Sequence, residues 1–195
     1  KDQGYGTALE ACEKSLARLD CGYIDLYLIH WPLKDLRNDS WKAFIELQKR
    51  GLCRSIGVSN FTIENLKELE EKYDVLPAIN QVEFHPYHYQ KELLEYCNSK
   101  NIIIEAYSPL VHAKRMDEPR LIAISDELSK TPAQVLIRWA IQKGMVVLPK
   151  SVNQDRIVEN FAVFDFDISN SLMKRLDNLD ERYVTCWDPH NPPPY

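Results

Sequence analysis

Apolar residues recur along this chain at two alternating spacings, and the two spacings predict alternating helices and strands. Four apolar residues from Leu9 to Leu19 stand at helical spacing and predict an amphipathic helix over residues 5–19. Thr131 is a helix cap followed by a first-turn proline and a capping-box glutamine, so a helix is expected to begin there and to end at Gly144. Further helices are expected around residues 41–51, 63–69, 93–97, 154–161 and 170–180.

Between these helices lie short runs rich in apolar residues, which are typical of strands buried on both faces, as in a parallel sheet. The five expected strands cover residues 24–30, 55–58, 78–84, 102–107 and 146–148. Strands that alternate with helices indicate βα units with parallel strands. Five such strands fit an open doubly wound sheet, and they fit equally the last five strands of an eight-stranded barrel. Periodicity alone does not separate the two.

Polar or aromatic residues that could bind a ligand stand at or near the carboxyl end of each expected strand. They are His30 and Trp31, Ser59 and Asn60, Gln81, Tyr107 and Ser108, and Lys150 and Ser151. Parallel strands end at one edge of the sheet, so we expect a shared binding face there. The Tyr107 ring could stack on a heterocycle, and Ser59, Asn60 and Gln81 could hydrogen-bond an amide such as the carboxamide of nicotinamide.

Two cations stand where a helix is expected to begin. Lys150 precedes the helix and Arg156 falls in its first turn, where the helix dipole disfavours positive charge by about 0.3–1 kcal/mol. An anion such as a phosphate would account for both cations, and two solvated surface side chains are the alternative. The chain contains no G-x-G-x-x-G and no P-loop motif, so a nucleotide would need another kind of site.

Composition excludes several classes of partner. The 195 residues carry a net charge of −5, which provides no basic face for nucleic acid. No apolar stretch approaches the ~20 residues of a membrane span. The five cysteines form no C-x-x-C pair, so we expect reduced thiols that act as small buried hydrophobic residues in an intracellular protein.

Other chemistry is possible at two pairs of residues but is not favoured. His85 and His88 suggest a metal pair, although Pro86 and the loop setting do not suit helical metal ligation. We therefore expect no metal site. Glu83 and Glu105 lie on expected strands and suggest an acid/base pair, for which structural or salt-bridged roles are the better interpretation.

Three motifs in the chain resemble one known family. Residues 25–32 read D-L-Y-L-I-H-W-P, residues 51–61 read G-L-C-R-S-I-G-V-S-N-F, and residues 150–160 fit the pattern K-S-x-x-x-x-R-x-x-E-N. Together with Q-V-E-F-H-P-Y at residues 81–87 and A-Y-S-P-L at residues 106–110, they make the chain similar to the aldo-keto reductase superfamily over essentially its whole length.

The resemblance implies a (β/α)8 barrel that reduces carbonyls to alcohols with NADPH. This chain would be a single domain over residues 1–195 that holds the last five βα units, the C-terminal helices and a loop. His30 would polarise the substrate carbonyl, with Trp31 lining the pocket. The cofactor residues implied are Ser59, Asn60 and Gln81 on the carboxamide, Tyr107 on the nicotinamide ring, Ser108 and Leu110 at the pyrophosphate, Lys150, Ser151, Val152 and Arg156 at the 2′-phosphate, and Glu159 and Asn160 on the adenine.

Lys150 and Arg156 together favour NADPH over NADH. We further expect a cytoplasmic monomer with a small carbonyl substrate and with no nucleic-acid or membrane partner. Trp187 stands in the C-terminal loop that varies in the family, where it would add an aromatic wall to the substrate pocket or simply pack.

The chain departs from the family pattern in two places. The family's catalytic tetrad also needs an aspartate, a tyrosine and a lysine, which precede the segment that begins here at Asp2. We therefore expect about 80–90 further residues at the amino terminus, from the usual size of such barrels, and an inactive fragment without them. The second departure is the segment of residues 111–115, V-H-A-K-R, which follows the Ser-Pro-Leu turn where the family usually has a glycine. We therefore expect the loop that closes over the pyrophosphate to differ in shape.

The missing tetrad residues leave alternative functions open. The leading hypothesis is a carbonyl reductase, and the alternative is a catalytically inactive, nucleotide-binding regulatory or structural relative. A third possibility is a natural truncated product that folds differently. The short tail and the compact loop after Leu110 look closer to microbial or protozoan members, which favours small aldehydes and diketones as substrates.

Overall fold

A computed structural model describes residues 2–186 of the chain. The chain forms two compact units. Unit 1 comprises Lys1–Gln81 and Glu95–Ile102, and unit 2 comprises Val82–Leu94 and Ile103–Tyr195. Strand β3 and helix α4 each contribute residues to both units, and each unit is described by itself below.

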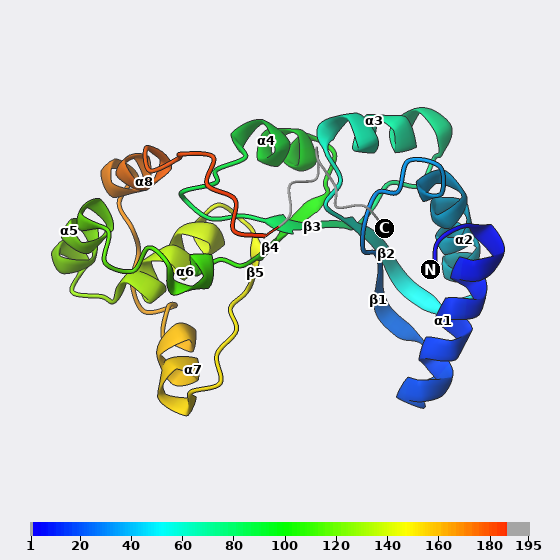
Figure 1. Cartoon of the computed structure of the whole chain (residues 1–195), viewed down its shortest axis with the longest axis horizontal. Coiled ribbons are helices and arrows are strands. Elements are labelled where there is room, and N and C mark those ends of the chain that lie inside the picture. The colour runs from blue at the N-terminus through cyan, green and yellow to red at the C-terminus, as the bar shows by residue number, and fades with distance from the viewer. Residues whose placement is uncertain (1, 187–195) are drawn as a thin grey trace. The chain divides into compact units, whose positions relative to one another are not determined.

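Unit 1 is built from βα units with parallel strands. Its elements are α1 (Tyr5–Leu19), β1 (Ile24–Ile29), α2 (Arg37–Lys49), β2 (Cys53–Ser59), α3 (Ile63–Lys72), the first residues of β3 (Ile79–Glu83) and most of α4 (Lys91–Ser99). Strands β1 and β2 pair in parallel, with Ile29 opposite Val58, and β2 pairs with β3, with Ser59 opposite Gln81. Helices α1 and α2 pack together beside these strands (Figure 1).

Unit 2 continues the same alternation. Its elements are the end of β3, β4 (Ile103–Tyr107), the short 3-10 helix η1 (Val111–Ala113), α5 (Pro119–Leu128), α6 (Pro132–Gln142), β5 (Val146–Leu148), α7 (Gln154–Phe161) and α8 (Asn170–Asp177). Strands β4 and β5 pair in parallel, with Tyr107 opposite Leu148. Phe84, just past β3, donates its backbone N–H to the Tyr107 carbonyl at 3.3 Å. Helix α6 packs against α5, α7 and β5 (Figure 1).

Each unit has its own apolar core. In unit 1, Trp41 on α2 and Ile56 on β2 are fully buried, and in unit 2 Phe84 and Trp139 are. Burying a side chain of this size contributes roughly 1.5–3 kcal/mol or more. The Trp139 indole N–H donates to the Asp177 carboxylate at 2.8 Å, so the buried ring also joins α6 to α8.

Gly57 sets how closely the strands of unit 1 approach one another. A Cβ atom at this position would lie 2.6 Å from a Leu28 methyl and 2.8 Å from the Ile79 carbonyl oxygen. Because a backbone oxygen cannot move aside cheaply, only glycine fits between β1 and β3. This residue therefore fixes the spacing of the strand ends that follow it.

The expected strands and the expected helices are confirmed, with shifts of a few residues at their ends. Thr131 caps α6 as predicted, and its hydroxyl and the Gln134 side chain form the capping box. One helix was missed: α5 begins at Pro119, and its cap is the side chain of Glu118, which accepts the backbone N–H of Leu121 at 2.9 Å. Glutamate is an unusual cap, so the local pattern carried little signal.

The prediction for the cysteines is partly wrong. All five are free thiols, and Cys12, Cys53 and Cys97 are buried as expected. Cys21 and Cys186 are exposed: Cys21 follows α1, and Cys186 is the last of the described residues, outside any helix or strand. Among the described residues, no helix combines the length and the hydrophobicity needed to cross a bilayer.

Candidate active site

Four residues at or near the carboxyl ends of the strands of unit 1 come together, and we name His30, Ser59, Asn60 and Gln81 the strand-end cluster. The Ser59 hydroxyl donates to the Gln81 carbonyl at 2.8 Å, and the Asn60 backbone N–H donates to the same oxygen at 2.9 Å. The Asn60 side-chain amide donates to the His30 carbonyl and to the Ser59 hydroxyl, both at 3.1 Å. These bonds join the carboxyl ends of β1 and β2 to each other and to Gln81, which lies within β3.

The strand-end cluster is held in place before any ligand arrives. Ser59 and Asn60 are 1% and 4% exposed, and buried polar groups of this kind rigidify a site when each has a partner. Asn60 adopts a left-handed backbone conformation with φ of 62°, which asparagine tolerates better than most residues. Neighbouring Asn80 secures the turn, since its side chain donates to the Phe61 carbonyl at 2.9 Å and accepts the Phe61 N–H at 3.3 Å.

His30 and Trp31 follow β1 but differ in exposure. The His30 side chain is exposed, whereas Trp31 is 3% exposed. The Trp31 carbonyl accepts a hydrogen bond from the Gln3 side chain at 2.8 Å, which ties the start of the chain to this strand end. An exposed imidazole beside a rigid polar cluster is chemically able to donate a hydrogen bond to a ligand oxygen.

The end of β4 carries Tyr107 and Ser108 in unit 2. Tyr107 is partly buried, and burial, with smaller contributions from Cys186 and Glu83, raises the pKa of its phenol. The Ser108 hydroxyl lies 3.1 Å from His112 Nε2. Tyr107 therefore stays neutral and can offer its ring face as a stacking surface.

The loop after Ser108 has an uncommon backbone. Ser108, Val111, His112 and Ala113 all have left-handed φ angles between 49° and 61°. This conformation is strained for a β-branched residue such as Val111, whereas glycine would adopt it freely. Val111 and His112 stand where the aldo-keto reductase pattern usually has a glycine. The left-handed backbone of this segment is one that glycine adopts more easily than they do. Leu110 caps η1 at the start of this turn.

Helix α7 begins with a second group of polar residues, and we name Lys150, Ser151, Asn153 and Arg156 the helix-start cluster. Asn153 caps the helix and accepts the Arg156 backbone N–H at 3.0 Å, while Ser151 accepts the Asn153 N–H at 3.1 Å. Both cationic side chains are exposed, and within the described part of the chain neither has an ion-pair partner. Unpaired cations at a helix N-terminus are suited to bind an anion.

The remaining predicted residues of this segment have different surroundings. Val152 is 87% exposed. Glu159 accepts a hydrogen bond from the Thr131 hydroxyl at 2.5 Å, so its carboxylate already joins α7 to the cap of α6. Asn160 is only 9% exposed. The structure therefore leaves Val152 open to a ligand, while Glu159 and Asn160 also stabilise the helix packing.

Residues 2–181 match the sequence profile of the Aldo/keto reductase family, and the parallel strands with their polar carboxyl ends agree with that match. The chain belongs to the aldo/keto reductase family.

Its relatives include a glyoxal reductase of Bacillus subtilis, which is 48% identical over 93% of this chain and 67% of its own length. A variant of Gox0644 in complex with NADPH has 40% sequence identity and a TM-score of 0.92, covering 97% of this chain and 71% of that one. An aldo-keto reductase of Bombyx mori in complex with NADP has 31% identity and a TM-score of 0.88, covering 95% and 66%. The chain thus spans about two thirds of the length of these relatives.

Within this aldo/keto reductase chain, the predicted residues fall into two groups. Unit 1 brings His30, Ser59, Asn60 and Gln81 together, and unit 2 places Tyr107 beside Ser108 and Lys150 near Arg156. The roles assigned to these residues stay predictions.

Trp187, expected near the substrate, lies outside the described residues. The part of the chain that the structure describes contains no group of three or more His, Cys, Asp or Glu that could hold a metal ion.

Sequence reasoning missed several residues of this aldo/keto reductase that shape the two groups. Asn80 and Asn153 secure the turns next to the strand-end and helix-start clusters. An asparagine inside an apolar strand and one before a helix were the available signals. Glu83, for which the sequence favoured a structural role over an acid/base role, accepts hydrogen bonds from residues 102 and 103 positions later in the chain. No local pattern could have indicated those contacts.

Proposed function

We propose that the full-length protein is an oxidoreductase that uses NADPH to reduce an aldehyde or ketone to an alcohol. We also propose that this chain supplies the last five βα units of a (β/α)8 barrel. The observation that carries the proposal is the strand-end cluster, in which the Asn60 amide joins the end of β1 at His30 to the end of β2 at Ser59. Such convergence at strand ends is where α/β barrels place catalysis.

The described residues fit a nicotinamide cofactor. Ser59, Asn60 and Gln81 offer hydroxyl and amide groups for a carboxamide, and Tyr107 offers a neutral aromatic ring for stacking. Lys150 and Arg156 are free to pair with a 2′-phosphate, which favours NADPH over NADH. Ser151 and Val152 would border the same phosphate, Ser108 and Leu110 the pyrophosphate, and Glu159 and Asn160 the adenine.

NADPH, when bound, supplies the hydride that reduces the carbonyl carbon. His30 would donate a hydrogen bond to the carbonyl oxygen, which holds the substrate in place and withdraws electron density from its carbon. Trp31 would form one wall beside the substrate, and Trp187 another. In our proposal the proton for the alcohol oxygen comes from the tyrosine of the family's tetrad, which is not among the residues of this chain.

The relatives support a small substrate. The similar Bacillus subtilis protein is a glyoxal reductase, so we propose small aldehydes and α-dicarbonyl compounds as the first substrates to examine. We further propose a location in the cytoplasm, because an odd number of cysteines without C-x-x-C pairs suits a reducing compartment. A monomer is also part of the proposal.

The test uses the full-length protein. We expect saturable NADPH binding in a fluorescence titration and NADPH oxidation with members of a panel that contains glyoxal, methylglyoxal, aromatic aldehydes and simple ketones. Tight NADPH binding without oxidation of any panel member would favour the inactive, nucleotide-binding alternative. Failure to bind either NADPH or NADH would overturn the proposal.

A further inference from the structure

The last described segment of the chain runs along the residues that follow β3 in unit 2, and we name residues 180–186 the strap. The backbone N–H groups of Glu181 and Tyr183 both donate to the Tyr87 carbonyl, at 3.1 and 2.9 Å. In return, the Tyr89 N–H donates to the Asp180 carboxylate at 3.2 Å. These bonds fix the first half of the strap, two of them between main-chain groups and one through the Asp180 side chain.

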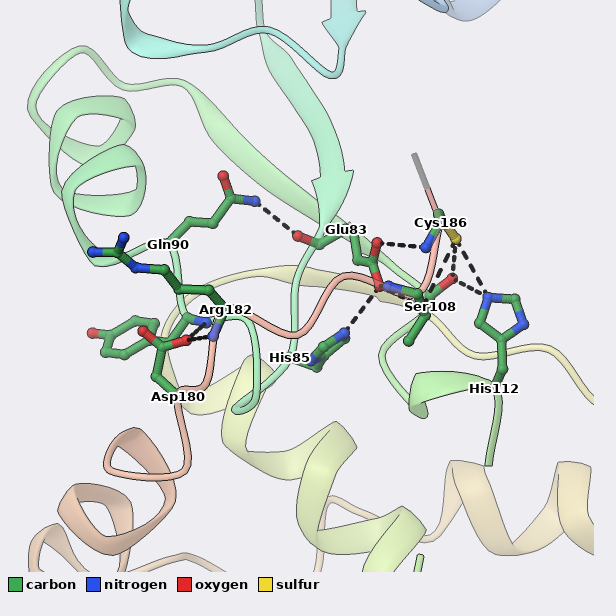
Figure 2. A network of polar contacts seen from close by, with 10 residues as sticks. Glu83, His85, Gln90, Ser108, His112, Asp180, Arg182 and Cys186 are labelled. Atoms are coloured by element: carbon green, nitrogen blue, oxygen red, sulfur yellow. Dashed lines mark hydrogen bonds and ion pairs between the residues drawn. The ribbon is translucent and has the colours of Figure 1, made fainter. Parts of the chain in front are cut away.

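Glu83 fixes the second half of the strap through its side chain. One carboxylate oxygen accepts the Thr185 backbone N–H at 2.8 Å and also the Thr185 hydroxyl, and the other accepts the Cys186 N–H at 3.0 Å. His85 Nε2 lies 3.1 Å from the first oxygen. Figure 2 shows the carboxylate between the strap and His85.

The surroundings of Glu83 explain why a carboxylate suits this position. The residue is 3% exposed, and burial by itself raises the pKa of a carboxyl group. Hydrogen bonds from His85, from the Thr185 hydroxyl and from two backbone amides outweigh that effect and lower the pKa of Glu83 to about 2. The group is therefore ionised near neutral pH, and an ionised carboxylate can only accept hydrogen bonds.

The end of the strap lies at the carboxyl end of β4. The Cys186 sulfur is 3.3 Å from the Ser108 hydroxyl and 3.3 Å from His112 Nε2, and these two groups are 3.1 Å apart (Figure 2). Ser108 and His112 also belong to the loop with left-handed φ angles. The strap thus contacts a strained loop beside Tyr107, and that contact depends on the residue that Glu83 holds.

We propose that Glu83 is a positioning residue for the cofactor-binding part of unit 2: its carboxylate holds the strap so that Cys186 restrains Ser108 and His112. The inference rests on the proposed function, because Ser108 borders the cofactor only in that proposal. Without the carboxylate, the strap beyond Tyr183 loses its anchor, and the loop after β4 loses the contact that keeps Ser108 in one orientation.

A purely structural role for Glu83 predicts a different result from a positioning role. Loss of a buried carboxylate would then loosen unit 2 as a whole, including the strap residues held by Tyr87. A positioning role predicts a local change, in which the amides held by Glu83 are freed while those held by Tyr87 keep their protection. Amide hydrogen exchange measured at single residues separates the two.

The main variant is Glu83→Gln in the full-length protein. It keeps the size of the side chain but replaces one acceptor oxygen by a donor that faces an amide donor. We expect exchange at the Thr185 and Cys186 amides to rise about tenfold or more, while exchange at Glu181 and Tyr183 is unchanged. We expect the Kd for NADPH to rise about tenfold.

A pair of conservative variants keeps the inference testable if Glu83→Gln does not fold. Thr185→Val removes the hydroxyl donor and should raise the Kd for NADPH by about threefold to tenfold. Thr185→Ser retains the hydroxyl and should bind NADPH as the unmodified protein does. Glu127→Gln is the matched control, since Glu127 is an exposed carboxylate of unit 2 that pairs with Arg175.

Equal acceleration of exchange at all four strap amides would overturn the inference, and so would an unchanged Kd for NADPH in both Glu83→Gln and Thr185→Val. Failure of the unmodified full-length protein to bind NADPH would instead overturn the proposed function. In that case the exchange result would still show whether Glu83 anchors the strap, so the two failures are distinguishable.

Discussion

The strand-end cluster of unit 1 and the helix-start cluster of unit 2 present polar groups in opposite ways. Ser59 and Asn60 are buried and bonded to their neighbours, whereas Lys150 and Arg156 are exposed side chains at the start of α7. The first arrangement is preorganised and loses little entropy when a ligand binds, while the second must order two long side chains. The first suits positioning of reacting groups, and the second suits affinity and choice of cofactor.

The largest expected effect tests the first half of this comparison. His30→Asn in the full-length protein should lower kcat by roughly 10²–10⁴-fold, the usual range for a positioned group that assists proton or charge transfer. The Kd for NADPH should change little, because Asn60 is bonded to the backbone carbonyl of His30, which the substitution retains. Steady-state kinetics and a fluorescence titration measure the two quantities.

His88→Asn is a suitable control, since His88 lies in unit 2 and has no assigned role. A kcat within tenfold of the unmodified value for His30→Asn would show that the imidazole is not the group that polarises the carbonyl.

The second prediction concerns the helix-start cluster. Lys150→Met and Arg156→Met should each raise the KM for NADPH by about 10–100-fold, the value of one charge-assisted hydrogen bond. The KM for NADH and the kcat with saturating NADPH should stay nearly constant, because neither involves the 2′-phosphate. Higher ionic strength should weaken NADPH binding to the unmodified protein more than to either variant.

Lys174→Met provides the matched control, because Lys174 is an exposed cation in the last turn of α8. If the Lys150 and Arg156 variants raised the KM for NADPH and the KM for NADH equally, these side chains would not bind the 2′-phosphate. The helix-start cluster would then have no part in the choice of cofactor.

The smallest expected effect is a difference in stability between two variants of Asn60. It distinguishes the contribution of the Asn60 side-chain hydrogen bonds from that of backbone strain. Asn60→Gly removes the amide bonds to His30 and Ser59 and should lower the free energy of unfolding by about 1–3 kcal/mol. Asn60→Ala should cost about 1 kcal/mol more, because φ at this position is 62° and alanine disfavours the left-handed region. Urea denaturation of the full-length variants measures both differences.

Asn101 offers an internal control with the same backbone geometry. Its φ is 57° and its side chain is exposed, so Asn101→Ala should again be less stable than Asn101→Gly, while Asn101→Gly should lose little. Equal stability of Asn60→Gly and Asn60→Ala would indicate that the turn after β2 is not strained.

Hydrophobic spacing alone was enough to predict the strands, most of the helices and the residues at each strand end. These features depend on short-range patterns: continuous apolar runs bury both faces of a parallel strand, and a Thr-Pro-x-Gln sequence satisfies the free amides at the start of a helix. The helix that begins at Pro119 was missed because its cap is the less usual Glu118.

The tertiary structure alone decided how the candidate residues are held. No local spacing indicates that the Asn60 amide joins two strand ends. Nor does any local spacing indicate that Glu83 anchors Thr185 and Cys186, more than one hundred positions later. Such bonds form only after parallel pairing aligns the strand ends and the chain returns to them, since hydrogen-bond geometry depends on the final path of the backbone. The residue types at the strand ends were thus determined by the sequence, and their partners by the fold.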